Sequence, residues 1–189
     1  MKKGKSVMVV LFILFILSLM WLTSSLMRLR IYAAAVKTNE IKDTWISEEQ
    51  QEYCREIGKQ YSICPELLMA MIEVESSGRE DVVNGDCVGL LQINEQWHRE
   101  RMKRLGVSDL KDGYSNIKVG ADYLSELFEE NEGDLYLVLM KYNMLHDKAE
   151  GFVEQGIYSE YSLKVAGRAE ELERLHEEKG EAYGKTDCD

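Results

Sequence analysis

The hydrophobic pattern begins with a long apolar run near the amino terminus. Residues 7–27 carry no charge, and residues 7–22 are almost wholly aliphatic or aromatic. At a rise of about 1.5 Å per residue the run reaches roughly 30 Å, enough to cross the apolar core of a bilayer. Three lysines precede it and two arginines follow it, which favours an amino terminus inside the cell and a body outside the cytoplasm. The alternative is a cleaved signal peptide that ends at Ala33 and Ala35, and it also exports the body.

Beyond this run, apolar residues recur at the spacing of amphipathic helices. Ser47 and Gln50 form a capping box that opens a helix reaching about Tyr61. Pro65 suits the first turn of a second helix, which ends near Ser76. Further helices are predicted over residues 116–128 with Asn116 as the cap, over residues 135–142, and beyond residue 158. The pattern predicts a mainly α domain, with at most a short hairpin near residues 80–93.

These elements divide the 189-residue chain into four segments, a length that suits one core with appendages. They are a membrane anchor or signal peptide at residues 1–35, a spacer at 36–46, a folded domain at 47–167 and an acidic tail at 168–189. The first segment holds five of the 23 basic residues and none of the 34 acidic ones, so the rest carries 18 basic against 34 acidic side chains. Such an acidic body repels phosphate backbones, which excludes nucleic acid as the main ligand.

Four cysteines would share an oxidising compartment if the body is exported. Cys54, Cys64, Cys87 and Cys188 allow three full disulfide pairings, and the sequence leaves the choice open. Cys54 also suits a small buried residue at helical spacing. The three histidines are scattered and no metal-binding spacing occurs, so no metal site and no cofactor is predicted.

A carboxyl group stands among the apolar residues of the second predicted helix. Glu75 follows Leu68 by seven residues and Ile72 by three, so the three side chains share one helix face. Glu73 lies off that face and is expected to be a solvated charge. Burial in an apolar setting raises the pKa of a carboxyl group, which suits a general acid. Glu75 is therefore the candidate catalytic residue.

Two later segments bring further polar groups to such positions. Residues 89–94, Gly-Leu-Leu-Gln-Ile-Asn, combine a glycine that permits close backbone approach with a donor–acceptor amide. Tyr142 places a hydroxyl on the apolar face of its predicted helix, and Asn143 follows it. Taken singly, each of these features is compatible with an ordinary core or loop residue. Glu75, residues 89–94 and Tyr142 with Asn143 form a specific pattern when they occur together in this order.

In this order the features resemble the lytic transglycosylase domain of the soluble-lytic-transglycosylase type, within the lysozyme-like superfamily, over residues 50–165. The resemblance implies an α+β lysozyme-like fold with minimal β structure, behind the predicted transmembrane helix. It implies that Glu75 is the catalytic acid/base and that the Tyr142 hydroxyl contacts it. The residues expected to bind substrate are Ser76, Asp86, Gly89, Gln92, Ile93, Asn94, Tyr142 and Asn143. Lys141 departs from the small residue that is common before Tyr-Asn in the family.

The resemblance implies cleavage of the β-1,4 bond between N-acetylmuramic acid and N-acetylglucosamine in peptidoglycan, with formation of a 1,6-anhydro ring. One alternative is a hydrolytic muramidase, because goose-type lysozymes resemble the placement of Asp86, which would then hold the attacking water. The other interpretation of Asp86 is a turn residue. A second alternative is a non-catalytic, membrane-tethered module that binds the wall. A small anchored glycan-cleaving enzyme also suits a conjugation or secretion apparatus as its partner.

Overall fold

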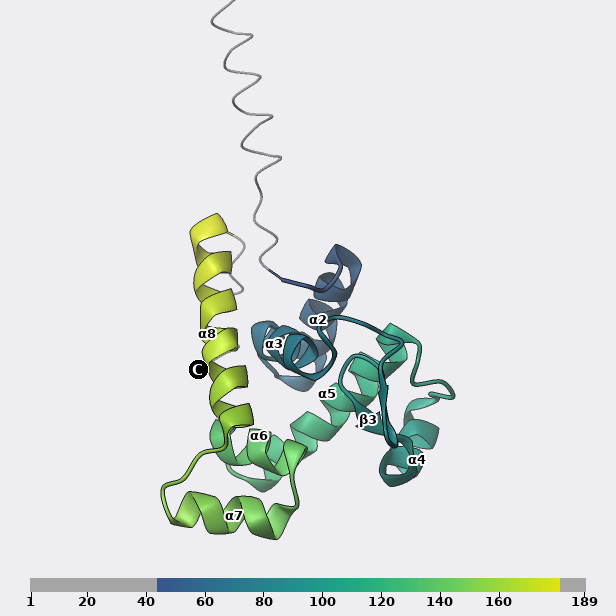
Figure 1. The fold of residues 1–189 in the computed structure, drawn as a ribbon. Helices are drawn as coiled ribbons and strands as arrows, with labels where there is room; N and C mark the ends of the chain where they lie inside the picture. Colours follow the sequence, from purple (N-terminus) through teal and green to yellow (C-terminus); the bar gives the residue numbers. More distant parts are fainter. Residues whose placement is uncertain (1–43, 181–189) are drawn as a thin grey trace, which may run out of the picture. The chain divides into compact units, whose positions relative to one another are not determined.

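Seven helices and three two-residue strands make up residues 44–180, the part of the chain that this computed structural model describes (Figure 1). The helices are α2 (Glu48–Tyr61), α3 (Pro65–Ser76), α4 (Glu95–Leu105), α5 (Gly113–Glu130), α6 (Leu135–Asn143), α7 (His146–Glu154) and α8 (Glu160–Lys179). The strands form one antiparallel sheet in the order β1 (Val83–Asn84), β2 (Cys87–Val88), β3 (Ile93–Asn94). The predicted mainly α architecture is confirmed.

The predicted membrane span, most of the spacer and the end of the acidic tail lie outside the described residues. Cys188 lies outside them as well. Within residues 44–180, no helix combines the length and the apolar character needed to cross a bilayer. The anchor at residues 1–35 therefore stays a prediction.

Local sequence signals determine where the first two described helices begin and end. The Ser47 hydroxyl accepts a hydrogen bond from the Gln50 N–H, and the Gln50 side chain accepts one from the Ser47 N–H. The predicted capping box is thereby confirmed. Pro65 is the first residue of α3, where its missing N–H breaks no helical hydrogen bond. The helix stops at Ser76, because Ser77 adopts the left-handed conformation.

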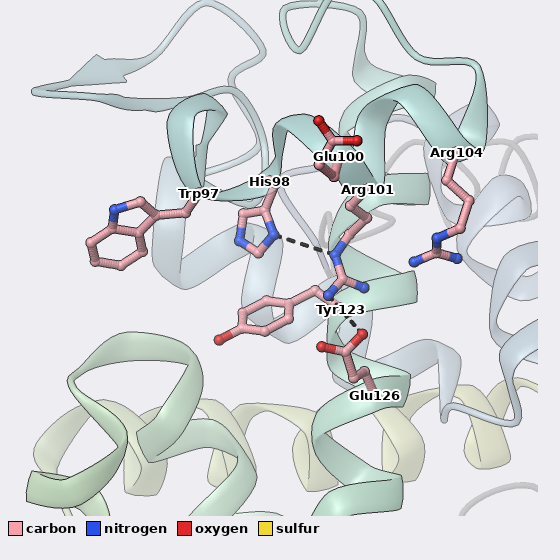
Figure 2. A pocket seen from close by; sticks show the side chains of 7 residues that line it. All are labelled: Trp97, His98, Glu100, Arg101, Arg104, Tyr123 and Glu126. Carbon is pink, nitrogen blue, oxygen red and sulfur yellow. Dashed lines mark hydrogen bonds and ion pairs between the residues drawn. The ribbon is translucent and has the colours of Figure 1, made fainter.

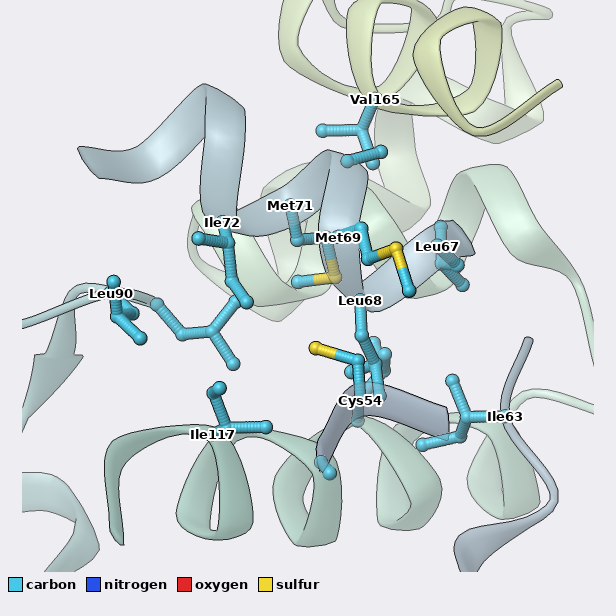
Figure 3. Close-up of a cluster of buried hydrophobic side chains, with 14 of the residues drawn as sticks. Cys54, Ile63, Leu67, Leu68, Met69, Met71, Ile72, Leu90, Ile117 and Val165 are labelled. Atoms are coloured by element: carbon cyan, nitrogen blue, oxygen red, sulfur yellow. The ribbon is translucent and has the colours of Figure 1, made fainter. Parts of the chain in front are cut away.

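Helix α3 forms the centre of the hydrophobic core. Every residue from Pro65 to Ile72 is buried, and α2 and α8 both pack against this helix. Figure 3 shows its side chains among buried residues of α2, α5 and α8, namely Cys54, Ile117 and Val165. A helix that is buried on all sides leaves the core only at its ends. The C-terminal end of α3, which carries the candidate carboxyl group, is one such place.

Asn116 is not the cap of α5, which corrects the sequence prediction. Asp112 caps this helix with its side chain. Asn116 lies one turn further on and is fully buried, and its side-chain oxygen accepts a hydrogen bond from the Leu91 N–H at 2.8 Å. Its side-chain nitrogen donates to the carbonyls of Val88 and Leu110 at 2.8 and 2.9 Å. One buried amide thus fixes the loop that contains residues 89–91.

Asn116→Ala is expected to destabilise the domain by about 3 kcal/mol, because it leaves one buried N–H and two carbonyls without their partner. Urea denaturation followed by circular dichroism measures this change as a lower unfolding midpoint. Gln96→Ala, an exposed position on α4, is the control and is expected to leave the midpoint nearly unchanged. Equal midpoints for Asn116→Ala and the wild type would contradict the role assigned to this amide.

The hydrophobic pattern did not predict helices α4 and α7, because each of them buries only one side chain. Only Met102 is buried in α4 and only Ala149 in α7, so neither helix carries an apolar stripe. Helix α8 also runs past the predicted domain boundary at residue 167. Leu172 and His176 are buried in its second half, so residues 168–179 form part of the folded domain and not a tail.

The described cysteines differ from one another. Cys54 is buried and free, which matches the interpretation of a small core residue, and burial raises the pKa of its thiol to about 12. Cys87 is free and half-buried in the hairpin. Cys64 is disulfide-bonded. A framework that pairs all four cysteines is therefore excluded.

Candidate active site

Glu75 lies where the buried helix α3 leaves the core. Its side chain is half-buried and lines an open cleft of about 650 Å³. Burial raises the pKa of this carboxyl group above its ordinary value of 4.5, because the ionised form loses hydration that the apolar surroundings do not replace. The group therefore stays protonated to higher pH than a solvated glutamate.

The cleft brings together most of the predicted site residues. The hairpin, the start of α4, helix α5 and the junction of α6 with α7 form its walls. The predicted residues among those that line it are Glu75, Gln92, Ile93, Asn94, Tyr142 and Asn143. Glu75 is the only carboxyl group among the described residues that line this cleft. Any acid–base chemistry by a carboxyl group in the cleft therefore falls to Glu75.

Gly89 and Gln92 shape the loop beside the cleft. Gly89 has φ +79°, and an added Cβ would lie 2.6 Å from the carbonyl oxygen of Leu110, so a larger residue would displace the Asn116-bound loop. Gln92 also adopts the left-handed conformation, with φ +47°. Its side-chain nitrogen donates to the carbonyls of Val82 and Gly89 at 3.2 and 2.9 Å. This leaves the Gln92 side-chain oxygen as an acceptor for a ligand in the cleft.

Ser76, Ile93 and Asn94 have local structural partners. The Ser76 hydroxyl is buried and donates to the Ile72 carbonyl at 3.1 Å, so it lies behind the cleft and does not line it. Ile93 is buried and contributes apolar surface. The Asn94 side-chain oxygen caps α4 by accepting hydrogen bonds from the first N–H groups of that helix, at 3.0 and 3.2 Å. Asn94 thereby fixes the start of α4 at the cleft wall.

Two tyrosines surround the carboxyl group of Glu75. The Tyr142 hydroxyl donates to the Leu91 carbonyl at 2.9 Å and not to Glu75, the contact that the resemblance implied. Burial, with the nearby charge of Glu75, raises the pKa of Tyr142 well above the usual range. Tyr161, at the start of α8, was not predicted from the sequence. Its buried hydroxyl makes no hydrogen bond of standard geometry within the described residues, yet it interacts with Glu75 and lowers the pKa of that carboxyl group. This interaction opposes the larger effect of burial.

Tyr161→Phe is expected to raise the pKa of Glu75 further, because it removes the hydroxyl whose interaction lowers that pKa while burial remains. If activity depends on protonated Glu75, the alkaline limb of the pH–rate profile then moves to higher pH. Measuring kcat/KM from pH 4 to 9 tests this, with Tyr158→Phe, an exposed neighbour in the preceding loop, as the control. A profile unchanged in position but lower in height would contradict an electrostatic role for Tyr161.

Glu73 corrects the expectation of a solvated charge. Its side chain is only 7% exposed and pairs with Arg168 of α8, with the Arg168 Nε 2.6 Å from Oε2. The Trp45 N–H also donates to its Oε1 at 3.1 Å. Both glutamates follow the fully buried stretch of α3, and both are only partly exposed. Glu73 has a cationic partner, whereas Glu75 faces the cleft.

Asp86 lies in the turn between β1 and β2 and is exposed. It is not among the residues that line the cleft. The position matches the interpretation of Asp86 as a turn residue.

An aromatic wall extends the cleft away from Glu75, and of its residues only Tyr142 was predicted from the sequence. The Tyr142 and Tyr123 rings lie 5.4 Å apart and the Tyr123 and His98 rings 4.5 Å apart, measured between centroids. Trp97 continues this wall and is 77% exposed. Burial, with the nearby Arg101 cation, lowers the pKa of His98 to about 4, so its ring is neutral at physiological pH. Trp97 and His98 come from α4, a helix that the pattern did not predict, whereas Tyr123 belongs to α5 and Tyr142 to α6.

Lys141 fills the position where the family has a small residue. Its side chain is 9% exposed and its Nζ lies 2.5 Å from a carboxylate oxygen of Glu150 on α7. Met144, Leu145 and His146 follow on the same side of the cleft. The His146 imidazole and the Tyr123 hydroxyl lie 3.3 Å apart. Lys141, the departure noted in the sequence, thus lies on the wall of the cleft where α6 meets α7.

Among residues 44–180, no group of three or more His, Cys, Asp or Glu side chains is arranged to hold a metal ion. The cleft offers a carboxyl group, amides, phenols and aromatic faces. This set suits hydrogen bonding to a polar, ring-shaped ligand and proton transfer by one acid.

The fold and the site define a class, a mainly helical domain whose open cleft is lined, among the residues that the structure describes, by one carboxyl group. The model of the family described as "Transglycosylase SLT domain" matches residues 52–152, more than half of the chain. The chain belongs to this family, as the sequence resemblance predicted.

Two named relatives and one solved structure are similar to the chain. Over 78 residues it is 37% identical to the endo-type membrane-bound lytic murein transglycosylase A of two Klebsiella pneumoniae strains. This match covers 37% of the chain and only 38% of the length of each relative. An inactive mutant of the lytic transglycosylase Slt from Pseudomonas aeruginosa superposes with a TM-score of 0.58 over 70% of this chain and 24% of that one. At 17% identity this likeness concerns the fold, and it confirms the lysozyme-like prediction.

Proposed function

We propose that this protein is a peptidoglycan lytic transglycosylase. It cleaves the β-1,4 bond between N-acetylmuramic acid and N-acetylglucosamine and leaves a 1,6-anhydro ring on the muramic acid. The observation that carries the proposal is the half-buried Glu75, whose pKa is raised and which is the only carboxyl group among the described residues lining the cleft. Membership of the family and the names of the relatives support the substrate class.

Protonated Glu75 acts first as the general acid. It donates its proton to the glycosidic oxygen as the bond from that oxygen to C1 of muramic acid breaks. The positive charge that develops at C1 is stabilised by the acetamido group of the substrate itself. No second protein carboxylate is then needed, which is an exception to the usual pair of acids in glycosidases.

The resulting Glu75 carboxylate acts next as the general base. It removes the proton from the 6-hydroxyl of the same muramic acid, and the 6-oxygen attacks C1 to close the anhydro ring. Glu75 regains its proton in this step, so the cycle consumes no water. The raised pKa suits both steps, because the group must be protonated before the reaction and able to ionise during it.

The hydrolytic alternative requires a second carboxylate that holds a water molecule, roughly 6.5–9.5 Å from the acid in an inverting enzyme. Asp86 is the candidate from the sequence, and its exposed place in the hairpin turn favours the transglycosylase. A wall-binding module without catalysis would gain nothing from a half-buried carboxyl group with a raised pKa.

Mass spectrometry of the muropeptides released from purified peptidoglycan by the full chain in detergent tests this proposal. Transglycosylation is expected to release products that are lighter than the hydrolytic ones by one water and that lack a reducing muramic end. Reducing products would instead identify a muramidase. Absence of any product from the folded protein would favour the binding module.

We also propose that residues 1–35 anchor the protein in the membrane and hold the domain outside the cytoplasm. The apolar run supports this, as does the word "membrane-bound" in the name of the relatives. Action beside a conjugation or secretion apparatus is part of the same proposal and rests on the small anchored architecture. Fractionation of cells that express the full chain, with and without residues 1–35, tests the anchor.

A further inference from the structure

A second pocket adjoins the cleft on the side away from Glu75. It encloses about 600 Å³ between α4 and α5. Three aromatic residues, Trp97, His98 and Tyr123, line both this pocket and the cleft. A ligand that lies in the cleft along this wall therefore has direct access to the second pocket.

Charged groups of both signs line the second pocket (Figure 2). Figure 2 shows the Trp97 indole on one side and the Arg104 guanidinium on the other, with His98, Arg101 and Tyr123 between them. The remaining lining residues are Glu100 and Glu126. The pocket is thus a polar site with an aromatic edge, unlike the apolar core beneath it.

Arg101 is held in place by several partners. Its guanidinium forms ion pairs with Asp122 and with Glu126, and its Nε donates to His98 at 3.3 Å. It also lies over the Tyr123 ring, 5.0 Å from the centroid. With a side chain only 10% exposed, Arg101 forms the rigid floor of the pocket.

Arg104 and Glu100 remain able to bind a ligand. Arg104 is 58% exposed, and two of its guanidinium nitrogens donate to Asp122 at 3.1 and 2.8 Å. A guanidinium has five N–H donors, so this pair leaves others for a ligand carboxylate. Glu100 is exposed and forms no ion pair with another described residue. The pocket therefore offers one cation and one anion at its rim.

We propose that this pocket binds the peptide stem of peptidoglycan while the glycan lies in the cleft. Every N-acetylmuramic acid of an unprocessed strand carries on its lactyl group a short peptide with carboxylates and an amino group. Arg104 binds a stem carboxylate, Glu100 binds the stem amino group, and the aromatic wall supports the sugar from which the stem projects. The inference rests on the proposed function, since it takes peptidoglycan as the ligand of the cleft.

Binding measurements separate this inference from the proposed activity. The full chain in detergent carries Glu75→Gln to prevent turnover, and calorimetry gives its Kd for two probes. One probe is glycan strands with their peptide stems, and the other is the same strands after an amidase has removed the stems. The stem-bearing strands are expected to bind roughly tenfold more tightly, the gain from one or two charge-assisted hydrogen bonds.

Substitutions at the rim assign this gain to the pocket. Arg104→Ala and Glu100→Gln are each expected to reduce the tenfold difference to about threefold and to leave the Kd for bare strands unchanged, because neither residue lines the cleft. Arg99→Ala is the matched control, an exposed residue of the same helix that does not line the pocket. Arg104→Ala breaks the ion pair with Asp122 and could unfold α4. Glu100→Gln keeps that pair, so it tests the pocket even in that case.

Equal Kd values for the two probes would overturn the inference, as would a stem preference that survives both rim substitutions. Failure of the proposed function has a different signature. The wild-type chain would then release no product from peptidoglycan, while the difference in binding between the two probes could still be measured.

Discussion

Glu75→Gln is expected to lower the rate of peptidoglycan cleavage by about 10³-fold, the usual contribution of a general acid. The amide keeps the size and most of the polarity of the side chain but has no proton to donate at the glycosidic oxygen. Since no other carboxyl group among the described residues lines the cleft, no neighbour replaces it. Release of soluble muropeptides from purified peptidoglycan measures the loss.

The same variant is expected to be at least as stable as the wild type at neutral pH. The pKa of Glu75 is raised in the folded state, so its contribution to stability is full below the unfolded pKa and is lost as pH rises through the folded pKa. A neutral amide avoids that loss. Asp86→Asn is the matched control and is expected to retain activity, because Asp86 lies exposed in the hairpin turn. Near-normal activity of Glu75→Gln would contradict the role of Glu75 as the general acid.

Arg168→Ala is expected to destabilise the domain by about 2–3 kcal/mol, because it leaves the Glu73 carboxylate buried without its cation. The value lies below the range for fully buried pairs, since the Arg168 side chain is 20% exposed. Thermal and urea unfolding measure the change. Arg174→Ala, which breaks an exposed pair with Glu178 on the same helix, is the control. It is expected to cost about 0.5 kcal/mol or less.

The pH dependence of stability gives an independent test of the same pair. Burial raises the pKa of Glu73, but hydrogen bonds from Arg168, Thr44 and the Trp45 N–H, with the Arg168 charge, outweigh it and hold the pKa below its ordinary value of 4.5. A lowered folded pKa contributes stability that is present above the unfolded pKa and is lost as pH falls through the folded pKa. The gap between wild type and Arg168→Ala is therefore expected to narrow below about pH 4.5. A gap that stays constant down to pH 3 would contradict this assignment.

Short-range signals in the sequence predicted most of the helices correctly. The capping box at Ser47, the proline at the start of α3 and the change of pattern after Ser76 each act within a few residues. The placement of Glu75 followed from one helix face, although α3 is in fact buried on nearly every side. Signals of this kind are readable without knowledge of the tertiary structure.

The errors concern groups whose partners lie far away in the chain. Glu73 pairs with Arg168, and Tyr161 reaches Glu75, because α8 packs along α3. Asn116 resembles a helix cap in sequence, but its amide is used by a loop 25 residues earlier. No local pattern carries such information, since hydrogen bonding and ion pairing depend on which elements meet in the fold.

In the candidate site, too, the residues with local sequence signals were predicted and the others were not. The motifs identified Glu75 and the loop at residues 89–94, whereas Trp97, His98 and most of the lining of the second pocket belong to α4, a helix that buries only Met102. A mostly polar helix of this kind gives no hydrophobic period to detect. Its exposed Trp97, a large apolar side chain without a packing role, is the one sequence feature that could have indicated a binding surface.

Digestion of peptidoglycan in water enriched in heavy oxygen tests the central claim most directly. If Glu75 closes the anhydro ring with the 6-hydroxyl of the substrate, the released glycan ends contain no label from the solvent. Mass spectrometry of the muropeptides is therefore expected to find unlabelled anhydro products. One heavy oxygen for every cleaved bond would show that water attacks C1, and would contradict the transglycosylase.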